Sequence, residues 1–478
     1  MTIRMKKFLK VLGIIVLVLL IILIALVGRV DRTPYQETKH YVAWQSWIAD
    51  QDFAVNRQPV QVAWAKRNIT PDQSYPMAGY GDRWGKHFEG VRDSLFVRAI
   101  SVLTPGGNVT FVAADLLIVP IDVRLRLETL LEKEGIAKEE IHLGAIHTHH
   151  GLGGWGKKLI GRLFAGKYDE QVEIMLAERF RDAILASREN PVAATIEYME
   201  TTYEEGIKNR LKVENKTIDP EVRNLVFTRA DGKKAVMLVY GAHTVILPAE
   251  LLELSRDYPG HVVDDLEAEE EVDFALFFAG AVGSMGYNAE GETKSERSAY
   301  MGRQLTDRFL ARYDREKSMD AFGDPAKTAM LDNPGSADSL RQQFPFYSQW
   351  IHIPLPAPTA RISVDYALRT WVFNSLFGAS PGDIKVTLIG RTLMLGMPAD
   401  FSGEIMKELD EYAKVKGLDL IITSFNGNYM GYITHDKHYE TNLYETVTMS
   451  WHGYQMGGYY TQISKDIIDH IAFSIIRL

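Results

Sequence analysis

Strand-length apolar runs alternate with amphipathic, helix-length stretches from about Val60 onward, and this alternation limits the possible folds more than any other feature. Such alternation is typical of α/β proteins, in which helices cover a sheet. We therefore predict an α/β fold with a mixed sheet and flanking helices. The expected strands are residues 95–103, 109–113, 141–146, 235–241, 274–278, 386–389, 393–395 and 418–423, and the clearest expected helices are residues 121–135 and 168–187.

Polar or glycine-rich features follow four of these expected strands. His147 and His243 each come directly after an apolar run, the turn Gly280–Gly286 follows a third run, and Asp400 lies just beyond a fourth. Open α/β sheets place their sites at the carboxyl ends of strands. The sequence therefore predicts one shared site, built at the carboxyl ends of the strands.

The stretch from His147 to Gly154 reads His-Thr-His-His-Gly-Leu-Gly-Gly. In extended backbone, residues i and i+2 face the same way, so His147 and His149 are expected to point into one pocket. Imidazole is the commonest side-chain metal ligand, and glycine lets the backbone approach a ligand closely. The pattern favours a metal or catalytic site over a histidine-rich surface turn.

Each of the other features has a plain structural alternative. His243 alone is typical of a hydrogen-bonded core histidine, and Gly280–Gly286 lacks the lysine of a phosphate loop, so a tight turn is the simpler interpretation. Asp400 is compatible with an ordinary helix cap. The tyrosines of residues 426–434 and Tyr444 are as a class more often packing residues than functional ones. The order in which these features occur, rather than any one of them, indicates a site.

Composition limits which ligands the chain can bind and which side chains could hold a metal. The net charge of −9 gives no basic footprint for nucleic acid. The chain has no cysteine, so a metal would have to be held by histidine, carboxylate or phenolate.

The N-terminus carries a candidate membrane segment. Arg4, Lys6, Lys7 and Lys10 precede an apolar run from Val11 to Val27. A spanning helix needs roughly 17–25 apolar residues, which this run just reaches. No clean small-x-small cleavage site follows, which favours an uncleaved anchor over a cleaved signal peptide that would leave a secreted protein. The positive-inside rule then places the N-terminus in the cytoplasm and the remainder outside it.

Taken together, these segments resemble the catalytic domain of the neutral/alkaline ceramidases, a zinc amidase family, over roughly residues 58–462. The family's His-Thr-His-Ser-Gly-Pro-Gly-Gly corresponds to His147–Gly154, and its Pro-Gly-Glu-Phe-Thr corresponds to Pro398-Ala399-Asp400-Phe401-Ser402. The other matching segments are Pro76–Gly81, Leu95–Ile100, Val112–Asp115, Asn209-Arg210, Ser255–Gly260, Tyr429–Thr434 and Tyr444-Glu445.

The resemblance implies a role for each matching residue. His147, His243 and Tyr432 would be zinc ligands, with Asp400 at the position of the family's glutamate. His149, Arg210 and Tyr444 would surround the scissile carbonyl, and Gly79, Gly283 and Ser284 would contact the substrate. Zinc lowers the pKa of its water to about 7 and polarises a carbonyl, which suits a poor electrophile such as an amide. No Gly-x-Ser-x-Gly elbow offers a serine mechanism instead.

We therefore expect a zinc-dependent hydrolase that cleaves ceramide or a related N-acyl lipid in the bilayer and is anchored by its N-terminal helix. The alternatives are a zinc amidase or esterase with another substrate, and a non-catalytic lipid-binding relative. The expected organisation is an anchor or signal segment at residues 1–28, a linker at 29–57 and the ceramidase-like domain at 58–478. Residues 324–380 are expected to be a long insertion or an excursion that covers the pocket.

Overall fold

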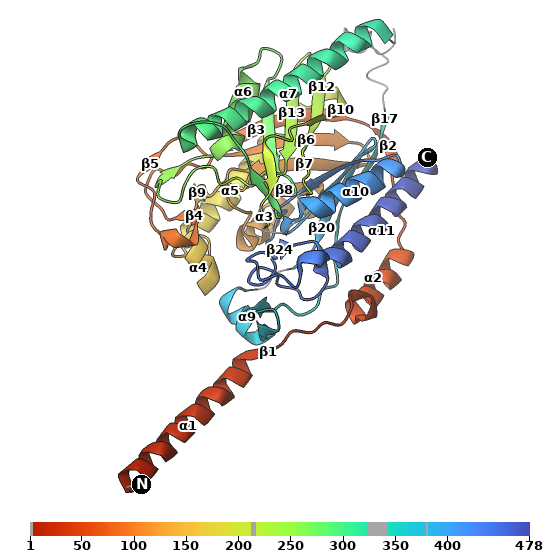
Figure 1. Cartoon of the computed structure of the whole chain (residues 1–478). Coiled ribbons are helices and arrows are strands. Elements are labelled where there is room, and N and C mark those ends of the chain that lie inside the picture. The colour runs from red at the N-terminus through yellow and green to blue at the C-terminus, as the bar shows by residue number, and fades with distance from the viewer. Residues whose placement is uncertain (1–2, 212–216, 324–342, 379–380) are drawn as a thin grey trace.

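The computed structural model describes residues 3–211, 217–323, 343–378 and 381–478 (Figure 1). Its largest sheet has eight strands in the order β15-β13-β12-β10-β3-β6-β7-β8. The two edge pairs, β13 with β15 and β7 with β8, are parallel, and the inner pairs are antiparallel. The strands are β3 (Gln61–Asn68), β6 (Phe96–Thr104), β7 (Gly107–Ala114), β8 (Ile141–Ala145), β10 (Val192–Thr202), β12 (Glu221–Arg229), β13 (Lys234–Tyr240) and β15 (Phe274–Ala279).

A second sheet has five strands in the order β2-β17-β20-β21-β23. Only its last pair, β21 with β23, is parallel. The strands are β2 (Asn56–Pro59), β17 (Gln343–Ile351), β20 (Ile384–Ile389), β21 (Thr392–Gly396) and β23 (Asp419–Thr423). The expected mixed α/β architecture is confirmed, and the described chain contains two large sheets where we expected one.

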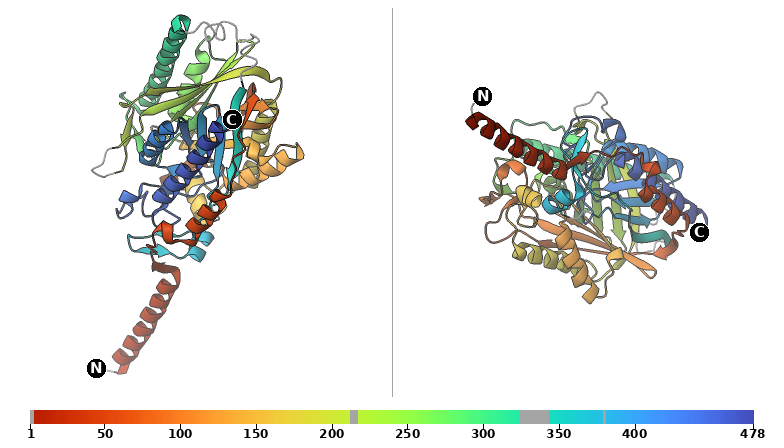
Figure 2. Two further views of the ribbon diagram at one scale, coloured as in Figure 1. Left: turned by 90° about the vertical axis from the view of Figure 1, so that its right-hand side faces the viewer. Right: turned by 90° about the horizontal axis from the view of Figure 1, so that it is seen from below.

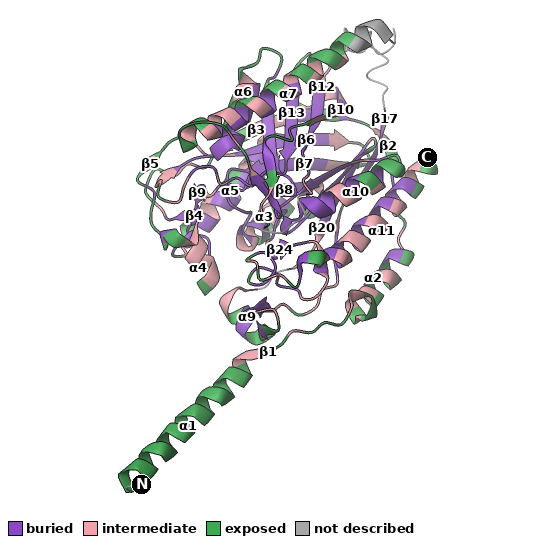
Figure 3. Cartoon of the chain, viewed as in Figure 1, coloured by how far each residue is buried: buried purple, intermediate pink, exposed green. Residues whose placement is uncertain are grey.

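The two sheets pack face to face through apolar side chains. Phe227 and Phe278 of the larger sheet share a buried cluster with Phe346, Met394 and Ile421 of the smaller one. The strands on either side of this cluster are buried along most of their length (Figure 3). The carboxyl ends of β15 and β23 lie together, because the amide of Ser424 donates to the carbonyl of Ala279 at 2.9 Å. Loops from both sheets therefore meet at one end of the molecule.

Helices cover the outer faces of both sheets. Helices α3 (Ile121–Lys133) and α5 (Glu170–Ala186) share a core with β6, β7 and β8. Helices α6 (Asp257–Ala268) and α7 (Lys294–Gly323) share another with β12, β13 and β15. Helices α2 (Lys39–Ala49), α10 (Gly403–Val415) and α11 (Met456–Ile476) pack on the five-stranded sheet.

Short elements complete the described chain. The strands are β1 (Val27–Arg29), β4 (Met77–Gly79), β5 (Gly90–Val91), β9 (His150–Leu152), β11 (Ile207–Asn209), β14 (Glu253–Leu254), β16 (Met285–Tyr287), β18 (Ala360–Arg361), β19 (Tyr366–Leu368), β22 (Asp400–Phe401) and β24 (Tyr432–Ile433). The helices are α4 (Leu159–Ala165), α9 (Thr370–Leu376) and the 3₁₀ turns η1 (Tyr35–Glu37), η2 (Gly81–Arg83), η3 (Lys138–Glu140) and η5 (Asp436–His438).

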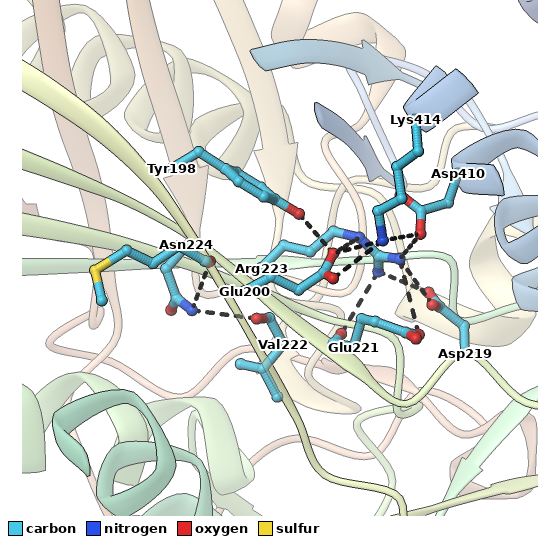
Figure 4. A network of polar contacts seen from close by, with 10 residues as sticks. Tyr198, Glu200, Asp219, Glu221, Val222, Arg223, Asn224, Asp410 and Lys414 are labelled. Carbon is cyan, nitrogen blue, oxygen red and sulfur yellow. Dashed lines mark hydrogen bonds and ion pairs between the residues drawn. The ribbon is translucent and has the colours of Figure 1, made fainter. Parts of the chain in front are cut away.

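An ionic network centred on the buried Arg223 joins the layers (Figure 4). Arg223 on β12 donates two hydrogen bonds, of 2.9 and 3.0 Å, to Asp219. Its guanidinium also lies 3.6 Å from Asp410 of α10. Lys414, one turn further along α10, donates to Asp410 at 2.8 Å and to Glu200 of β10 at 3.0 Å. Because a broken buried pair leaves an uncompensated charge, this network fixes α10 against the eight-stranded sheet.

Helix α1 (Ile3–Leu26) projects from the body in every view (Figures 1 and 2). None of its residues is buried, and within the described chain it alone is long and apolar enough to span a membrane. Its 24 residues give a rod of about 36 Å, compared with about 30 Å for the hydrocarbon core of a bilayer. The expected N-terminal apolar helix is confirmed in length and composition.

Two segments differ from what we expected, namely the predicted linker at residues 29–57 and the predicted insertion or excursion at residues 324–380. Within residues 29–57, Trp44, Ile48 and Phe53 are buried in the core of the five-stranded sheet, so this stretch packs as part of the domain. Residues 324–342 and 379–380 lie outside the described residues. Residues 343–351 form β17 inside the five-stranded sheet, so the prediction of an excursion was wrong there. Pro345 and the polar residues after it hid the strand pattern.

Candidate metal centre and active site

His147 occupies a constrained position just after β8. Its backbone has a φ of 63°, in the left-handed region, where a residue other than glycine is unusual. Its ring stacks on Phe425, with centroids 4.0 Å apart. Its Nδ1 lies 2.8 Å from the carbonyl of Leu117, which accepts the Nδ1 proton. This hydrogen bond fixes the tautomer and leaves the Nε2 lone pair available to a ligand.

Two further imidazoles converge on His147. His243, three residues after β13, places its Nε2 3.0 Å from the Nε2 of His147. The Nε2 of His149 lies 3.4 Å from the same atom. Burial lowers the pKa of His147 to about 3 and the pKa values of His149 and His243 well below the ordinary value. Three neutral imidazoles thus direct nitrogen atoms to one point. His147 and His149 share a pocket as expected, but not through extended backbone, because His147 has a positive φ.

The fourth imidazole of this region points elsewhere. His150 starts β9, and both of its ring nitrogens lie within 3.2 Å of the Arg83 guanidinium. These contacts direct His150 toward Arg83 and away from the cluster.

Asp400 lies beside the three imidazoles, in the segment that follows β21 of the five-stranded sheet. It lies on β22, paired in parallel with β24 so that Asp400 is in register with Tyr432. Its Oδ1 lies 3.6 Å from His147 Nε2 and 3.9 Å from His243 Nδ1. This oxygen is buried and has no hydrogen-bond partner among the described residues. Its Oδ2 accepts a hydrogen bond of 2.7 Å from the Tyr429 hydroxyl.

Asp400 and Tyr432 both have raised pKa values, as expected of buried acidic groups that a cation would stabilise. Burial raises the pKa of Asp400 to about 7, although the Tyr429 hydrogen bond opposes the shift. Burial, followed by the neighbouring Asp400 carboxylate, raises the pKa of Tyr432 well above its ordinary value. An unpartnered carboxylate oxygen beside imidazole lone pairs is costly unless a cation or proton lies between them.

The donor atoms fit a zinc ion. Bonds of about 2.0–2.1 Å meeting at the tetrahedral angle place ligand atoms roughly 3.3 Å apart. The His147–His243, His147–His149 and His147–Asp400 contacts of 3.0, 3.4 and 3.6 Å lie around that value. The three imidazoles form a group with candidate ligand atoms within 4.8 Å of one another. By distance alone, His149 is as well placed to bind a metal as Asp400 is.

Arg210 borders the cluster on the side of His243. Its backbone amide donates to the carbonyl of Ser284 at 2.9 Å, which places it just after β11. Its Nη1 lies 3.0 Å from His243 Nδ1, and its Nη2 lies 3.1 Å from Glu445 Oε1. Tyr444 stands beside it, with its ring 5.9 Å from that of Tyr432 in an edge arrangement. The structure therefore brings all the expected catalytic and metal-ligand residues to one place.

The residues expected to contact substrate separate into two groups. Gly79 lines the cavity, and its φ of 128° and the 2.5 Å between an added Cβ and His149 Cα both require glycine. Gly283 lies behind Asp400, where an added Cβ would come 2.4 Å from the Asp400 carbonyl oxygen. Ser284 is buried against Ser402, with hydroxyls 3.1 Å apart. Gly283 and Ser284 are not among the lining residues, so they contact the backbone of the site residues instead.

A cavity of about 380 Å³ opens above the cluster. Its floor contains His147, His149, Asp400, Tyr432 and Tyr444. Its walls are mostly apolar, which suits an aliphatic ligand. The apolar lining residues are Leu117, Ile118, Pro120, Ile121, Leu125, Trp155, Ile160, Phe164, Phe377, Met449 and Trp451.

Sequence reasoning missed Tyr429 and Glu445 as participants in the site. The Tyr429 hydroxyl binds Asp400, and Glu445 pairs with Arg210. Both lie close in sequence to the predicted site residues Tyr432 and Tyr444. Only the folded loop shows which way their side chains point. Glu404, the second residue of α10, binds His438 at 2.7 Å and Lys437 at 3.1 Å and does not line the cavity. Asp400 is therefore the carboxylate of this segment that reaches the cluster.

No protein-family model matches this sequence, and no curated protein sequence matches it significantly. Solved structures do match. The neutral ceramidase from Pseudomonas aeruginosa aligns with a TM-score of 0.72 at 16% identity, covering 88% of this chain and 75% of that one. The structure of a ceramidase complexed with C2 aligns with a TM-score of 0.73 at 15% identity, covering 88% of this chain and 76% of the other. This chain therefore has a neutral ceramidase-like fold.

Proposed function

We propose that this chain is a membrane-anchored, extracytoplasmic zinc amidohydrolase that cleaves the amide bond of ceramide or a related N-acyl lipid, releasing a fatty acid and a sphingoid base. The observation that carries the proposal is the convergence of His147, His243 and Asp400 on one point, where His147 and Asp400 line the floor of an apolar cavity. The ceramidase-like fold supports the same chemistry. Residues 1–28 would be the anchor, and residues 58–478, together with the packed segment 29–57, would form the catalytic domain.

His147, His243, Asp400 and Tyr432 would hold the metal. A zinc ion there would supply Lewis acidity, which makes a water nucleophilic near neutral pH and polarises a carbonyl. Leu117 holds His147 through its Nδ1 proton, and Tyr429 holds Asp400 through its Oδ2. Such outer contacts orient ligands and sustain their basicity.

The remaining polar groups would act on the substrate. Arg210 carries a positive charge that lies between His243 and Glu445, and Tyr444 lines the cavity, so we assign both to stabilising a developing oxyanion. Because four protein ligands need no third imidazole, we assign His149 to proton transfer toward the leaving amine. The apolar walls would take the acyl chain and exclude water from it.

The test is fatty-acid release from ceramide by the purified full-length chain in detergent. We expect activity that a chelator abolishes and that added zinc restores. An Asp400→Asn variant is expected to lose metal affinity, because a neutral amide is a poor zinc ligand.

Two outcomes would replace the proposal. Chelator-sensitive activity on other amides or esters, with none on ceramide, would indicate another substrate. Stoichiometric lipid binding without zinc or turnover would indicate a non-catalytic lipid-binding protein.

A further inference from the structure

The end of helix α1 is fixed to the body of the protein. Strand β1 begins at the residue after the helix and pairs with β19 in the register Val27↔Leu368 to Arg29↔Tyr366. The amide and Nε of Arg369 donate to the carbonyls of Leu26 and Ile24, at 2.9 and 3.1 Å. The indole of Trp371 donates to Ala25 at 3.3 Å. These bonds satisfy carbonyls of the last helical turn and leave no flexible residues between α1 and the domain.

Large apolar side chains are exposed at the same end of the molecule. We name Leu125, Leu159, Ile362, Tyr366 and Trp371 the apolar rim. Leu159 is 62% and Trp371 56% exposed, and the other three are exposed as well. Figure 1 shows that α4 and α9, which carry Leu159 and Trp371, lie at the end from which α1 leaves.

The rim borders the mouth of the cavity. Leu125 lines the cavity itself, and Leu159 immediately precedes the lining residue Ile160. Helix α9 leads directly into Phe377 and Gly378, which also line it. An added Cβ on Gly378 would lie 3.3 Å from the side chain of Lys158, so α4 and α9 approach each other across this opening.

Acidic groups beside the rim are paired with cations. Asp365, between Ile362 and Tyr366, lies 3.1 Å from Arg32. Asp122, three residues before Leu125, lies 3.0 Å from Lys157. An apolar surface whose neighbouring acids are already paired is suited to the edge of a bilayer, where tryptophan and tyrosine are enriched.

We propose that the apolar rim is a second membrane-contact surface, which seats the mouth of the cavity on the bilayer that holds α1. The bilayer is the expected occupant because the rim is continuous with α1 through β1, β19 and the Trp371 hydrogen bond. A substrate lipid then passes from bilayer to cavity without crossing water. The inference rests on the proposed anchor and deepens the proposed lipid hydrolysis.

Single-cysteine labelling tests the contact without using activity. The chain has no cysteine, so Leu159→Cys and Trp371→Cys each provide one labelling position in the full-length protein. Val415→Cys, at the end of α10 and 85% exposed, is the matched control. Each variant carries an environment-sensitive fluorophore and is reconstituted into phosphatidylcholine nanodiscs. We expect spin-labelled lipid to quench the labels at 159 and 371, and aqueous iodide to quench the label at 415. Iodide quenching at 159 and 371 equal to that at 415 would overturn the proposal.

A second measurement links the contact to substrate entry. Leu159→Asp and Trp371→Asp are expected to lower turnover of bilayer-embedded ceramide about tenfold, roughly the factor that burial of one such side chain contributes. Turnover of detergent-dispersed ceramide should stay unchanged, as should both activities of Val415→Asp. An equal loss in bilayer and detergent would contradict a membrane role. If the unmodified chain is inactive in detergent, the proposed hydrolysis fails, and the labelling result still decides the membrane contact.

Discussion

Replacing Tyr429 by phenylalanine isolates the bond that holds Asp400. The hydroxyl donates at 2.7 Å to Asp400 Oδ2, and the other carboxylate oxygen has no hydrogen-bond partner among the described residues. The ring itself packs edge-on against Trp451, with centroids 5.3 Å apart, and phenylalanine retains that contact. The substitution therefore removes one donor from a buried carboxylate and keeps the ring contact with Trp451.

The size of the effect follows from the charge and burial of Asp400. A hydrogen bond to a charged group contributes about 1.5–3 kcal/mol. At about 1.4 kcal/mol for each factor of ten, this predicts zinc binding weaker by roughly 10- to 100-fold. Without the donor, the carboxylate must also be held in place for the metal by its remaining neighbours alone.

The assay is a zinc titration of the full-length chain in competition with a chromophoric chelator. Tyr459→Phe is the control, because its hydroxyl donates to the Pro354 carbonyl at 2.8 Å in a similarly buried position on α11. Both variants lose one buried hydrogen bond, so a difference in zinc affinity between them reports on Asp400. Equal affinities for the two variants and the unmodified chain would refute this account of how Asp400 is held.

Three further outcomes are expected. His147→Ala should abolish stoichiometric zinc by elemental analysis, whereas His149→Ala should keep zinc and lose roughly 10²–10⁴-fold in turnover; loss of zinc from both would make His149 a ligand. Arg210→Ala and Tyr444→Phe should retain zinc and lower kcat, and an unchanged kcat in both would remove them from the mechanism. Burial lowers the pKa of Lys385 to about 7. Above pH 7 the unfolded chain therefore binds a proton that the folded chain has lost. The free energy of unfolding consequently rises with pH. The stability gained by Lys385→Met, measured by urea denaturation, should therefore shrink by about 2 kcal/mol from pH 7 to pH 9; a gain independent of pH would contradict the low pKa.

The sequence allowed prediction of those parts of the site that follow a regular strand. His147 and His243 were found because each comes directly after a buried run, at the end of a strand that belongs to a parallel pair, β8 or β13. Asp400 was placed in the shared site because it lies just beyond an expected strand, and its role as a ligand came from the family resemblance. Tyr432 was assigned only through that resemblance, because the two-residue strands β22 and β24 have no periodicity to read.

Other features depend on the folded chain. Tyr429 resembles any packing tyrosine until its hydroxyl is seen beside Asp400. The second sheet was not anticipated, because β2 is short and β17 contains Pro345, which interrupts the apolar alternation. The burial of Trp44 and Ile48 in α2 was hidden by the position of that helix between an anchor and a domain. In each case a tertiary contact, rather than a local preference, decided the outcome.

The donors of the cluster come from both sides of the interface between the two sheets. His147 and His243 follow strands of the eight-stranded sheet, whereas Asp400 and Tyr432 follow strands of the five-stranded sheet. An ion bound by all four would act as a cross-link between the layers, since it binds only the form in which they are docked. By mass action, free metal at about 1,000 times its dissociation constant would add about 4 kcal/mol to the stability of that form. The same ion would therefore set both the chemistry of the cavity and the resistance of the layers to separation.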